Sequence, residues 1–213
     1  MEQTGKRQRN KEKSPLLEGL LIAGLLTLFG FLTWKAHYAA LLLLALCAWR
    51  MAHNIGNLQE GLYSLGIRKP GKWWYLWLAA GLGTGAFAWA FFRILPEDGI
   101  IFPRIGLFAI SAFLVGLAEE LVYRGFLFHL WQRYGAVVVI ALTSLAHLTY
   151  KLALLLPQPS VDLELVASWT VIAGLVLGML RYFSGSVLPA AANHILFDVL
   201  AYGSSDAGPD WVW

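Results

Sequence analysis

Long runs of apolar residues recur along this chain, and the short stretches between them carry most of the charged and turn-forming residues. A run of about 17–25 apolar residues is long enough to cross a bilayer as a helix. The pattern predicts seven such segments, at 16–34, 38–52, 73–95, 105–128, 136–156, 165–183 and 186–203. The second segment is short for a full crossing. We therefore predict an all-α fold, a polytopic transmembrane helical bundle of about seven spans.

The same pattern divides the chain into four parts. Residues 1–15 form a basic tail, and residues 16–104 contain the N-terminal transmembrane helices, with a loop or interfacial helix at 53–72. Residues 105–203 contain the candidate chemistry and are the predicted catalytic core. Residues 204–213 form a short polar tail that also contains tryptophan.

Composition supports a membrane protein and excludes a typical soluble fold. Of the 213 residues, 58% are hydrophobic and 14% are charged, against roughly 45–50% and about 25% in soluble domains. The net charge of +3 does not indicate a nucleic-acid partner, because lysine and arginine crowd the first tail, where they suit an anionic membrane surface. The single cysteine, Cys47, cannot form a disulfide within the chain. Composition alone therefore indicates the lipid bilayer as a partner.

Charged residues in the short loops predict the orientation, because lysine and arginine are enriched on the cytoplasmic side. With the basic tail inside, six more cations fall inside: Arg50, Arg68, Lys69, Lys72, Arg133 and Arg181. Asp98, Asp162 and Glu164 fall outside. We predict a multi-pass protein of the bacterial cytoplasmic membrane with a cytoplasmic N-terminus. Amphipathic rings prefer the membrane interface. We therefore expect an interfacial position for five tryptophans near predicted helix ends: Trp34, Trp49, Trp73, Trp74 and Trp131.

Ionisable residues within the apolar segments mark the candidate site. One charged side chain near a helix centre costs about 2.5–3.5 kcal/mol. The fourth segment carries three such residues, Glu119, Glu120 and Arg124. Without compensating partners, their insertion would cost roughly 7–10 kcal/mol in total. The fifth and seventh segments add His147, Asn193, His194 and Asp198. Three helices thus bring polar groups to a similar depth, where they must face one another or a wet cavity.

Helical spacing assigns different roles to these residues. Glu120 and Arg124 are four apart with the acid on the N-terminal side, which favours an ion pair within the helix. Glu119 lies about 100° around the helix from Glu120, so we predict that it is the free carboxylate, suited to act as a general base. His194 and Asp198 are also four apart, and an acid at that spacing can orient an imidazole.

Lys151 follows His147 by four residues in the fifth segment. Its position would allow the ammonium group to reach the cavity. Long cationic side chains near helix ends usually extend to the membrane interface. We therefore expect Lys151 to extend to the outer interface.

The run EELVYRGFL at 119–127 resembles the EExxxR signature of the CPBP family. This family joins CAAX proteases of the Rce1 type with bacteriocin-processing and Abi-type membrane proteins. Two further motifs strengthen the resemblance: TSLAH at 143–147 occupies the place of the family's FxxxH, and HILFD at 194–198 fits HxxxN/D. Thr143 replaces the family's phenylalanine. The resemblance covers approximately residues 105–203.

The resemblance implies a glutamate-dependent intramembrane endopeptidase, whose expected partner is a membrane-associated protein or peptide substrate. We expect no cofactor, with zinc as the alternative. Carried over by position, Glu119 and His147 activate a water molecule, Glu120 and Arg124 support them, and His194 and Asp198 lie on the oxyanion side. Asp198 stands where one branch of the family has asparagine, whose amide can donate a hydrogen bond that an ionised aspartate cannot. Two roles therefore stay open for Asp198: oxyanion donor or orienter of His194.

Three other functions remain alternatives. Glu119, His147 and His194 could form a catalytic zinc shell, which would make the protein a metalloprotease. A non-catalytic bacteriocin-immunity or binding protein could reuse the scaffold, and a proton-coupled transporter could use Glu119 as its carrier. The sequence lacks the HExxH motif of common zinc proteases. It also lacks the GxSG motif of rhomboid serine proteases and the second intramembrane aspartate of aspartyl proteases.

Overall fold

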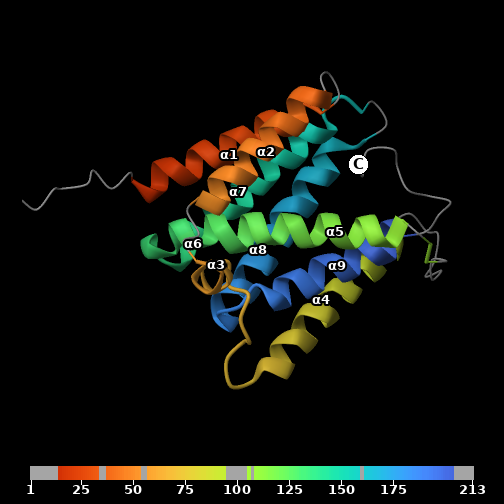
Figure 1. Cartoon of the computed structure of the whole chain (residues 1–213). Helices are drawn as coiled ribbons and strands as arrows, with labels where there is room; N and C mark the ends of the chain where they lie inside the picture. Colours follow the sequence, from red (N-terminus) through yellow and green to blue (C-terminus); the bar gives the residue numbers. More distant parts are fainter. Residues whose placement is uncertain are drawn as a thin grey trace, which may run out of the picture.

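The computed structural model describes residues 14–33, 37–53, 57–94, 105–106, 108–158 and 161–203. Within these ranges the chain forms helices joined by loops and no β-sheet, which confirms the all-α prediction (Figure 1). The helices are α1 (Pro15–Leu32), α2 (His37–His53), α3 (Leu58–Ser64), α4 (Trp74–Ile94), α5 (Phe108–Glu120), α6 (Phe128–Trp131), α7 (Ala136–Leu155), α8 (Leu163–Ser184) and α9 (Leu188–Tyr202). A π-helical segment, η1 (Leu121–Leu127), joins α5 to α6, and a short 3-10 segment, η2 (Gln132–Tyr134), follows α6.

Each predicted apolar segment coincides with a helix, and the fourth comprises α5 and η1 in succession. Among the described residues, four helices are long and apolar enough to cross a membrane: α1, α4, α7 and α8. A helical membrane bundle is thereby confirmed. The count of seven spans stays a prediction, because α2, α5 and α9 are shorter. Residues 1–13 of the predicted tail 1–15 lie outside the described residues, as do the tail 204–213 and Asp98.

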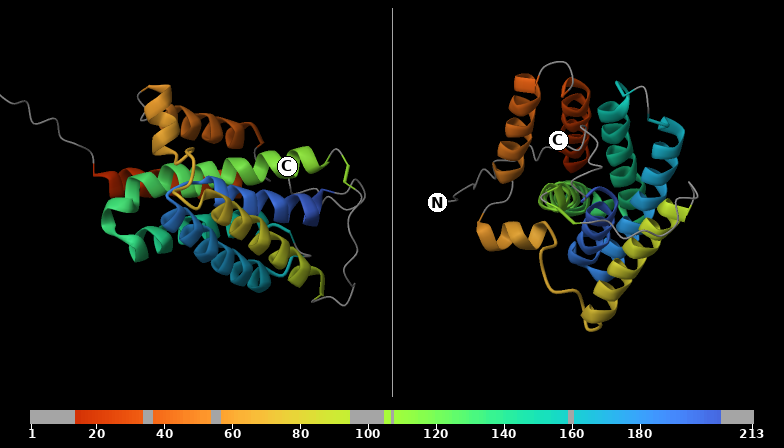
Figure 2. Two further views of the ribbon diagram at one scale, coloured as in Figure 1. Left: turned by 90° about the horizontal axis from the view of Figure 1, so that it is seen from below. Right: turned by 90° about the vertical axis from the view of Figure 1, so that its right-hand side faces the viewer.

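Helix α5 lies in the middle of the bundle. Figure 2 shows it nearly end-on, surrounded by the other long helices. The most extensive packing joins α7 to α8, α4 to α9, α5 to α9 and α1 to α7. Because α5 carries the two predicted glutamates near its end, this arrangement places them inside the protein and away from lipid.

Glycines on α4 allow α9 to approach closely. A Cβ atom at Gly81 would meet the backbone of Pro189, and one at Gly85 would meet the backbone of Asn193. Two small residues four apart commonly permit such contacts between membrane helices. The Asn193 side chain donates from Nδ2 to Oγ1 of Thr84 at 2.7 Å. Asn193 therefore links α9 to α4 and does not join the predicted site.

The turn between α8 and α9 directs the last helix back into the bundle. Helix α8 ends at Gly185, whose φ of 70° lies in the left-handed region where glycine has no steric penalty. Helix α9 starts three residues further on, at Leu188, with Pro189 in its first turn, where the missing N–H leaves no hydrogen bond unmade. This turn fixes the direction in which α9 carries its histidine toward α5.

Trp131 is buried, so its predicted interfacial position was wrong. Its exposed fraction is 0%, because α1 covers this end of α6. A Cβ atom at Gly19 would collide with the indole ring, and Nε1 donates to the carbonyl oxygen of Leu16 at 3.5 Å. Trp34 lies outside the described residues. The other three tryptophans of this prediction are largely exposed, in agreement with an interfacial position: Trp49, Trp73 and Trp74.

Candidate active site

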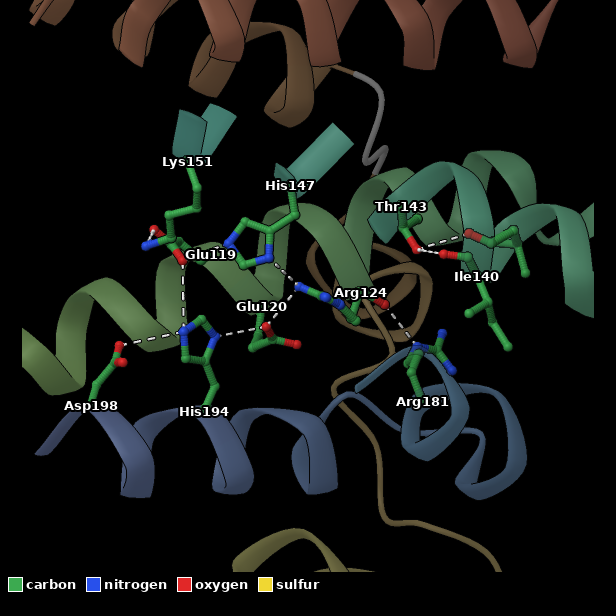
Figure 3. Close-up of polar contacts among 11 residues, drawn as sticks. Glu119, Glu120, Arg124, Ile140, Thr143, His147, Lys151, Arg181, His194 and Asp198 are labelled. Carbon is green, nitrogen blue, oxygen red and sulfur yellow. Dashed lines mark hydrogen bonds and ion pairs between the residues drawn. The ribbon is translucent and has the colours of Figure 1, made fainter. Parts of the chain in front are cut away.

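Three helices and the π-helical segment bring all the predicted site residues into one polar cluster, which we call the central cluster (Figure 3). Helix α5 supplies Glu119 and Glu120, and η1 supplies Arg124. Across from them, α7 supplies His147, and α9 supplies both His194 and Asp198. Every one of these residues except His194 is buried, and the His194 side chain is 11% exposed.

The π-helical segment begins directly after the two glutamates, at the end of α5. Such segments add one residue to a helical turn and often occur at functional sites. The carbonyl oxygen of Arg124, within this segment, accepts a hydrogen bond from Nε of Arg181 at 2.9 Å. This contact satisfies a backbone group in a segment where the ordinary helical pattern is interrupted.

Glu120 binds two partners through one oxygen. Nη1 of Arg124 donates to its Oε1 at 3.0 Å, which is the ion pair predicted from their spacing. Nδ1 of His194 donates to the same oxygen at 2.9 Å. The side chains of Glu120 and Arg124 are 0% exposed. Glu120 is therefore the carboxylate that holds His194 by a direct hydrogen bond, although the sequence spacing had indicated Asp198 for that task.

The contacts of His147 define which ring nitrogen carries the proton. Nη1 of Arg124 lies 3.0 Å from Nδ1 of His147, and a guanidinium can only donate, so Nδ1 accepts. Nε2 must then carry the hydrogen, and it donates to Oε2 of Glu119 at 2.9 Å. Both nitrogens of His147 are thus engaged, one by the supporting arginine and one by the predicted base.

Lys151 contacts Glu119, so its expected extension to the outer interface was wrong. Its Nζ lies 2.7 Å from Oε1 of Glu119. At this distance the ammonium and the carboxylate form a close ion pair. The Lys151 side chain is 18% exposed, more than any other side chain of the central cluster. Burial of Glu119 explains the orientation, because a carboxylate in a poorly hydrated site attracts the nearest cation.

His194 places its second nitrogen between two carboxylates. Nε2 lies 3.7 Å from Oε2 of Glu119 and 3.5 Å from Oδ2 of Asp198. Both distances exceed those of a good hydrogen bond. Gly116 of α5 faces Asp198, and a Cβ atom there would lie 3.1 Å from Oδ2. The lack of a side chain at Gly116 thus makes room for the carboxylate of Asp198.

Thr143 occupies the family's phenylalanine position without leaving its hydroxyl unpaired. It is fully buried, and Oγ1 donates within its own helix to the carbonyl oxygens of Val139 and Ile140 at 2.8 and 3.2 Å (Figure 3). Aromatic packing on His147 comes instead from Tyr123, whose ring stacks on the imidazole with centroids 4.5 Å apart. Tyr123 is a residue of the site to which the sequence had assigned no role, and Lys151 is one that it had assigned to the outer interface.

The central cluster pairs acids with bases in a confined space. Glu119 faces Lys151, Glu120 faces Arg124, and Asp198 is nearest to His194. Among the described residues, no group of three or more His, Cys, Asp or Glu side chains is arranged to hold a metal ion. The arrangement offers a carboxylate that can accept a proton and ring nitrogens that can donate hydrogen bonds.

Comparison with known proteins finds one family. Residues 101–200 match the family model of the type II CAAX prenyl endopeptidases, Rce1-like. The matched region contains all three motifs and every residue of the central cluster. No curated protein and no solved structure matches the chain.

Proposed function

We propose that the chain is a glutamate-dependent intramembrane endopeptidase, in agreement with the match of residues 101–200 to the Rce1-like family of type II CAAX prenyl endopeptidases, a protease family. Its substrate is a membrane-associated protein or peptide. The observation that carries this proposal is the buried Glu119 carboxylate, held between His147 and Lys151 in the centre of the bundle. The protein belongs to a bacterial cytoplasmic membrane, with its N-terminus on the cytoplasmic side.

Glu119 is the group that accepts the proton from water. His147 is a weaker candidate, because its Nδ1 accepts from Arg124 and its Nε2–H already donates to Glu119. His147 instead holds one oxygen of the carboxylate in place. As the water oxygen attacks the carbonyl carbon of the substrate, Glu119 takes one of the two water protons.

Attack converts the carbonyl oxygen into an oxyanion, which needs hydrogen-bond donors. His194 is suited to this as the imidazolium, in which both ring nitrogens carry a hydrogen: the N–H at Nδ1 donates to Glu120, and the N–H at Nε2 is the donor for the oxyanion. When the bond between carbonyl carbon and nitrogen breaks, Glu119 returns its proton to the leaving amine. The products are a new carboxyl group and a free amine, and the carboxylate of Glu119 is regenerated.

The test is cleavage of membrane-anchored peptides by the full-length protein in detergent. Glu119→Gln keeps the volume of the side chain and removes the base, so we expect it to lower kcat roughly 10²–10⁴-fold. The matched control is Glu60→Gln, which changes an exposed glutamate of α3 and should leave kcat unchanged. Cleavage by Glu119→Gln at the wild-type rate would overturn the proposal.

The geometry also supports catalysis without zinc. A zinc ion bound at Nε2 of His147 would require that nitrogen to lose its proton while Nδ1 still accepts from Arg124. The Lys151 ammonium, 2.7 Å from Glu119, would repel a second cation. We expect purified protein to keep its activity in strong chelator and to contain less than one zinc per chain by elemental analysis. Loss of activity on chelation, with recovery on adding zinc, would instead establish a metalloprotease.

A further inference from the structure

Two loops outside the central cluster are fastened to each other. One is the segment 66–71 between α3 and α4, and the other is the turn 184–188 between α8 and α9. The backbone N–H of Val187 donates to the carbonyl oxygen of Gly66 at 2.9 Å. The hydroxyl of Ser186 donates to the carbonyl oxygen of Arg68 at 2.5 Å. These contacts hold the loops in a fixed relation.

Each of the two loops is also contacted by an arginine that lies across from it. Nε of Arg68 donates to the carbonyl oxygen of Gly185 at 2.7 Å. In return, the guanidinium of Arg181 packs on Gly66, where a Cβ atom would lie 2.7 Å from Nη2. Both glycines have positive φ, 72° at Gly66 and 70° at Gly185. The lack of a side chain at these turns lets the two guanidinium groups approach the loops closely.

Neither arginine has an acidic partner in the described part of the chain. Arg181 is only 4% exposed, and its Nε donates to the backbone of Arg124. Its guanidinium lies over the Phe128 ring at 4.8 Å, and that of Arg68 lies over the Tyr63 ring at 4.4 Å. No carboxylate lies within ion-pair distance of either guanidinium among the described residues. Two like charges that repel each other at a largely buried position are unfavourable unless an anion compensates them.

The residues around Arg68 and Arg181 indicate the chemical class of the compensating anion. Lys69 lies over the Trp74 ring at 5.2 Å, and Lys72 lies over the Trp73 ring at 5.6 Å. Both tryptophans are exposed at the start of α4, a helix long enough to cross the membrane. Exposed tryptophans with adjacent lysines are typical of the membrane interface, the depth at which lipid phosphates lie.

We propose that Arg68 and Arg181 bind the phosphate group of an anionic lipid. With each Nε bound to a backbone carbonyl oxygen, the terminal nitrogens of both guanidiniums are the donors that face a ligand. Guanidinium groups bind phosphate oxygens through paired N–H donors, which a lysine cannot reproduce. Arg181 also contacts the backbone of Arg124, whose side chain binds Glu120 and His147. An anionic lipid bound here therefore stabilises the segment that carries the supporting arginine.

The experiment measures lipid binding by the full-length protein in neutral detergent. Native mass spectrometry compares phosphatidylglycerol with phosphatidylcholine, and inorganic phosphate tests the same chemistry without acyl chains. Arg68→Gln removes the half-buried arginine. Arg181→Lys keeps the charge at the buried position and removes the paired donors. The matched control is Arg133→Gln, which removes one exposed positive charge elsewhere. Thermal unfolding without lipid verifies that each variant folds.

We expect one phosphatidylglycerol to bind at least tenfold more tightly than phosphatidylcholine, a difference of about 1.4 kcal/mol. Arg68→Gln and Arg181→Lys should each abolish that preference, and Arg133→Gln should keep it. Should Arg181→Lys fail to fold, Arg68→Gln alone decides. Equal binding of the two lipids, or a preference unaffected by Arg68→Gln, would overturn the proposal.

Two further results would identify a different anion and also overturn the proposal. One is tight binding of inorganic phosphate with no preference among lipids, which would show that the ligand is a free anion. The other comes from peptide cleavage. If Arg68→Gln raised KM for a substrate with a free C-terminal carboxylate and not for its amide, with lipid binding unchanged, the ligand would be the substrate. Inactivity of the wild-type protein toward peptides would contradict the proposed function and leave the lipid measurement intact.

Discussion

Glu119 and Glu120 are adjacent in sequence and of the same type, but they occupy different surroundings. Glu120 lies on the closed side of the central cluster, where its side chain and that of Arg124 are 0% exposed. Glu119 lies on the open side, where its side chain is 8% exposed and that of Lys151 is 18% exposed. A helical rotation of about 100° is enough to direct one carboxylate into the protein and the other toward the accessible side.

The partners of the two glutamates differ in the same way. Arg124 is always charged and holds Glu120 through a hydrogen bond, so this pair is a fixed support. Lys151 forms an ion pair with Glu119 at 2.7 Å, and its side chain is 18% exposed. The pair of Glu119 and Lys151 is therefore the more exposed of the two pairs. The difference suggests that Glu120 acts mainly on stability and Glu119 mainly on turnover.

The sharpest test of this division is Glu120→Gln. The amide leaves the buried guanidinium of Arg124 without a carboxylate and replaces the charged acceptor of His194 by a neutral one. Breaking a buried ion pair in this way costs about 3–5 kcal/mol, so we expect a marked fall in Tm in detergent. Glu119→Gln should lower Tm much less, because Lys151 can turn to solvent. A Tm for Glu120→Gln equal to that of wild type would contradict the division.

Lys151 gives the next largest expected effect. Lys151→Met removes the cation next to Glu119 and leaves the carboxylate without its ion pair, so we expect kcat to fall by roughly 10–100-fold, about 1.4–2.7 kcal/mol in barrier. Lys151→Arg should recover part of this activity, because it restores the charge in a different shape. The control is Lys72→Met, an exposed lysine outside the cluster. Wild-type kcat in Lys151→Met would show that the ion pair does not contribute to turnover.

Much of the fold and the composition of the site could be predicted, because both depend on local patterns. The apolar runs gave the helices, and the spacing of Glu120 and Arg124 gave their ion pair. Trp131 and Lys151 were predicted incorrectly for the same physical reason. Each lies on a helix whose neighbours, α1 for the tryptophan and α5 for the lysine, determine its surroundings. Periodicity within one helix contains no information on such neighbours.

A spacing signal for the missed residues was present in the sequence. Tyr123 follows Glu119 by four residues, and Lys151 follows His147 by four, so each shares a helix face with a predicted site residue. The partner of His194 is a different case. Asp198 had the favourable spacing within α9, but Glu120 of α5 makes the hydrogen bond. The choice between a local and a distant carboxylate depends on how closely α5 and α9 pack, which glycines such as Gly116 decide.

The smallest expected effect is that of Asp198→Asn. This substitution distinguishes the two roles left open for Asp198: oxyanion donor and orienter of His194. An orienter of His194 must accept a hydrogen bond from the ring, and Asp198→Asn would then reduce activity severely, as loss of an orienting carboxylate does in a catalytic triad. Glu120 already orients His194 through Nδ1 at 2.9 Å, whereas Asp198 lies 3.5 Å from Nε2. We therefore expect Asp198→Asn to retain kcat within roughly tenfold of wild type, about 1.4 kcal/mol in barrier, because the amide supplies a permanent donor on the oxyanion side. His194→Ala should lose far more activity. A collapse of Asp198→Asn to the level of His194→Ala would assign the orienting role to Asp198 and leave Glu120 as a partner of Arg124 alone.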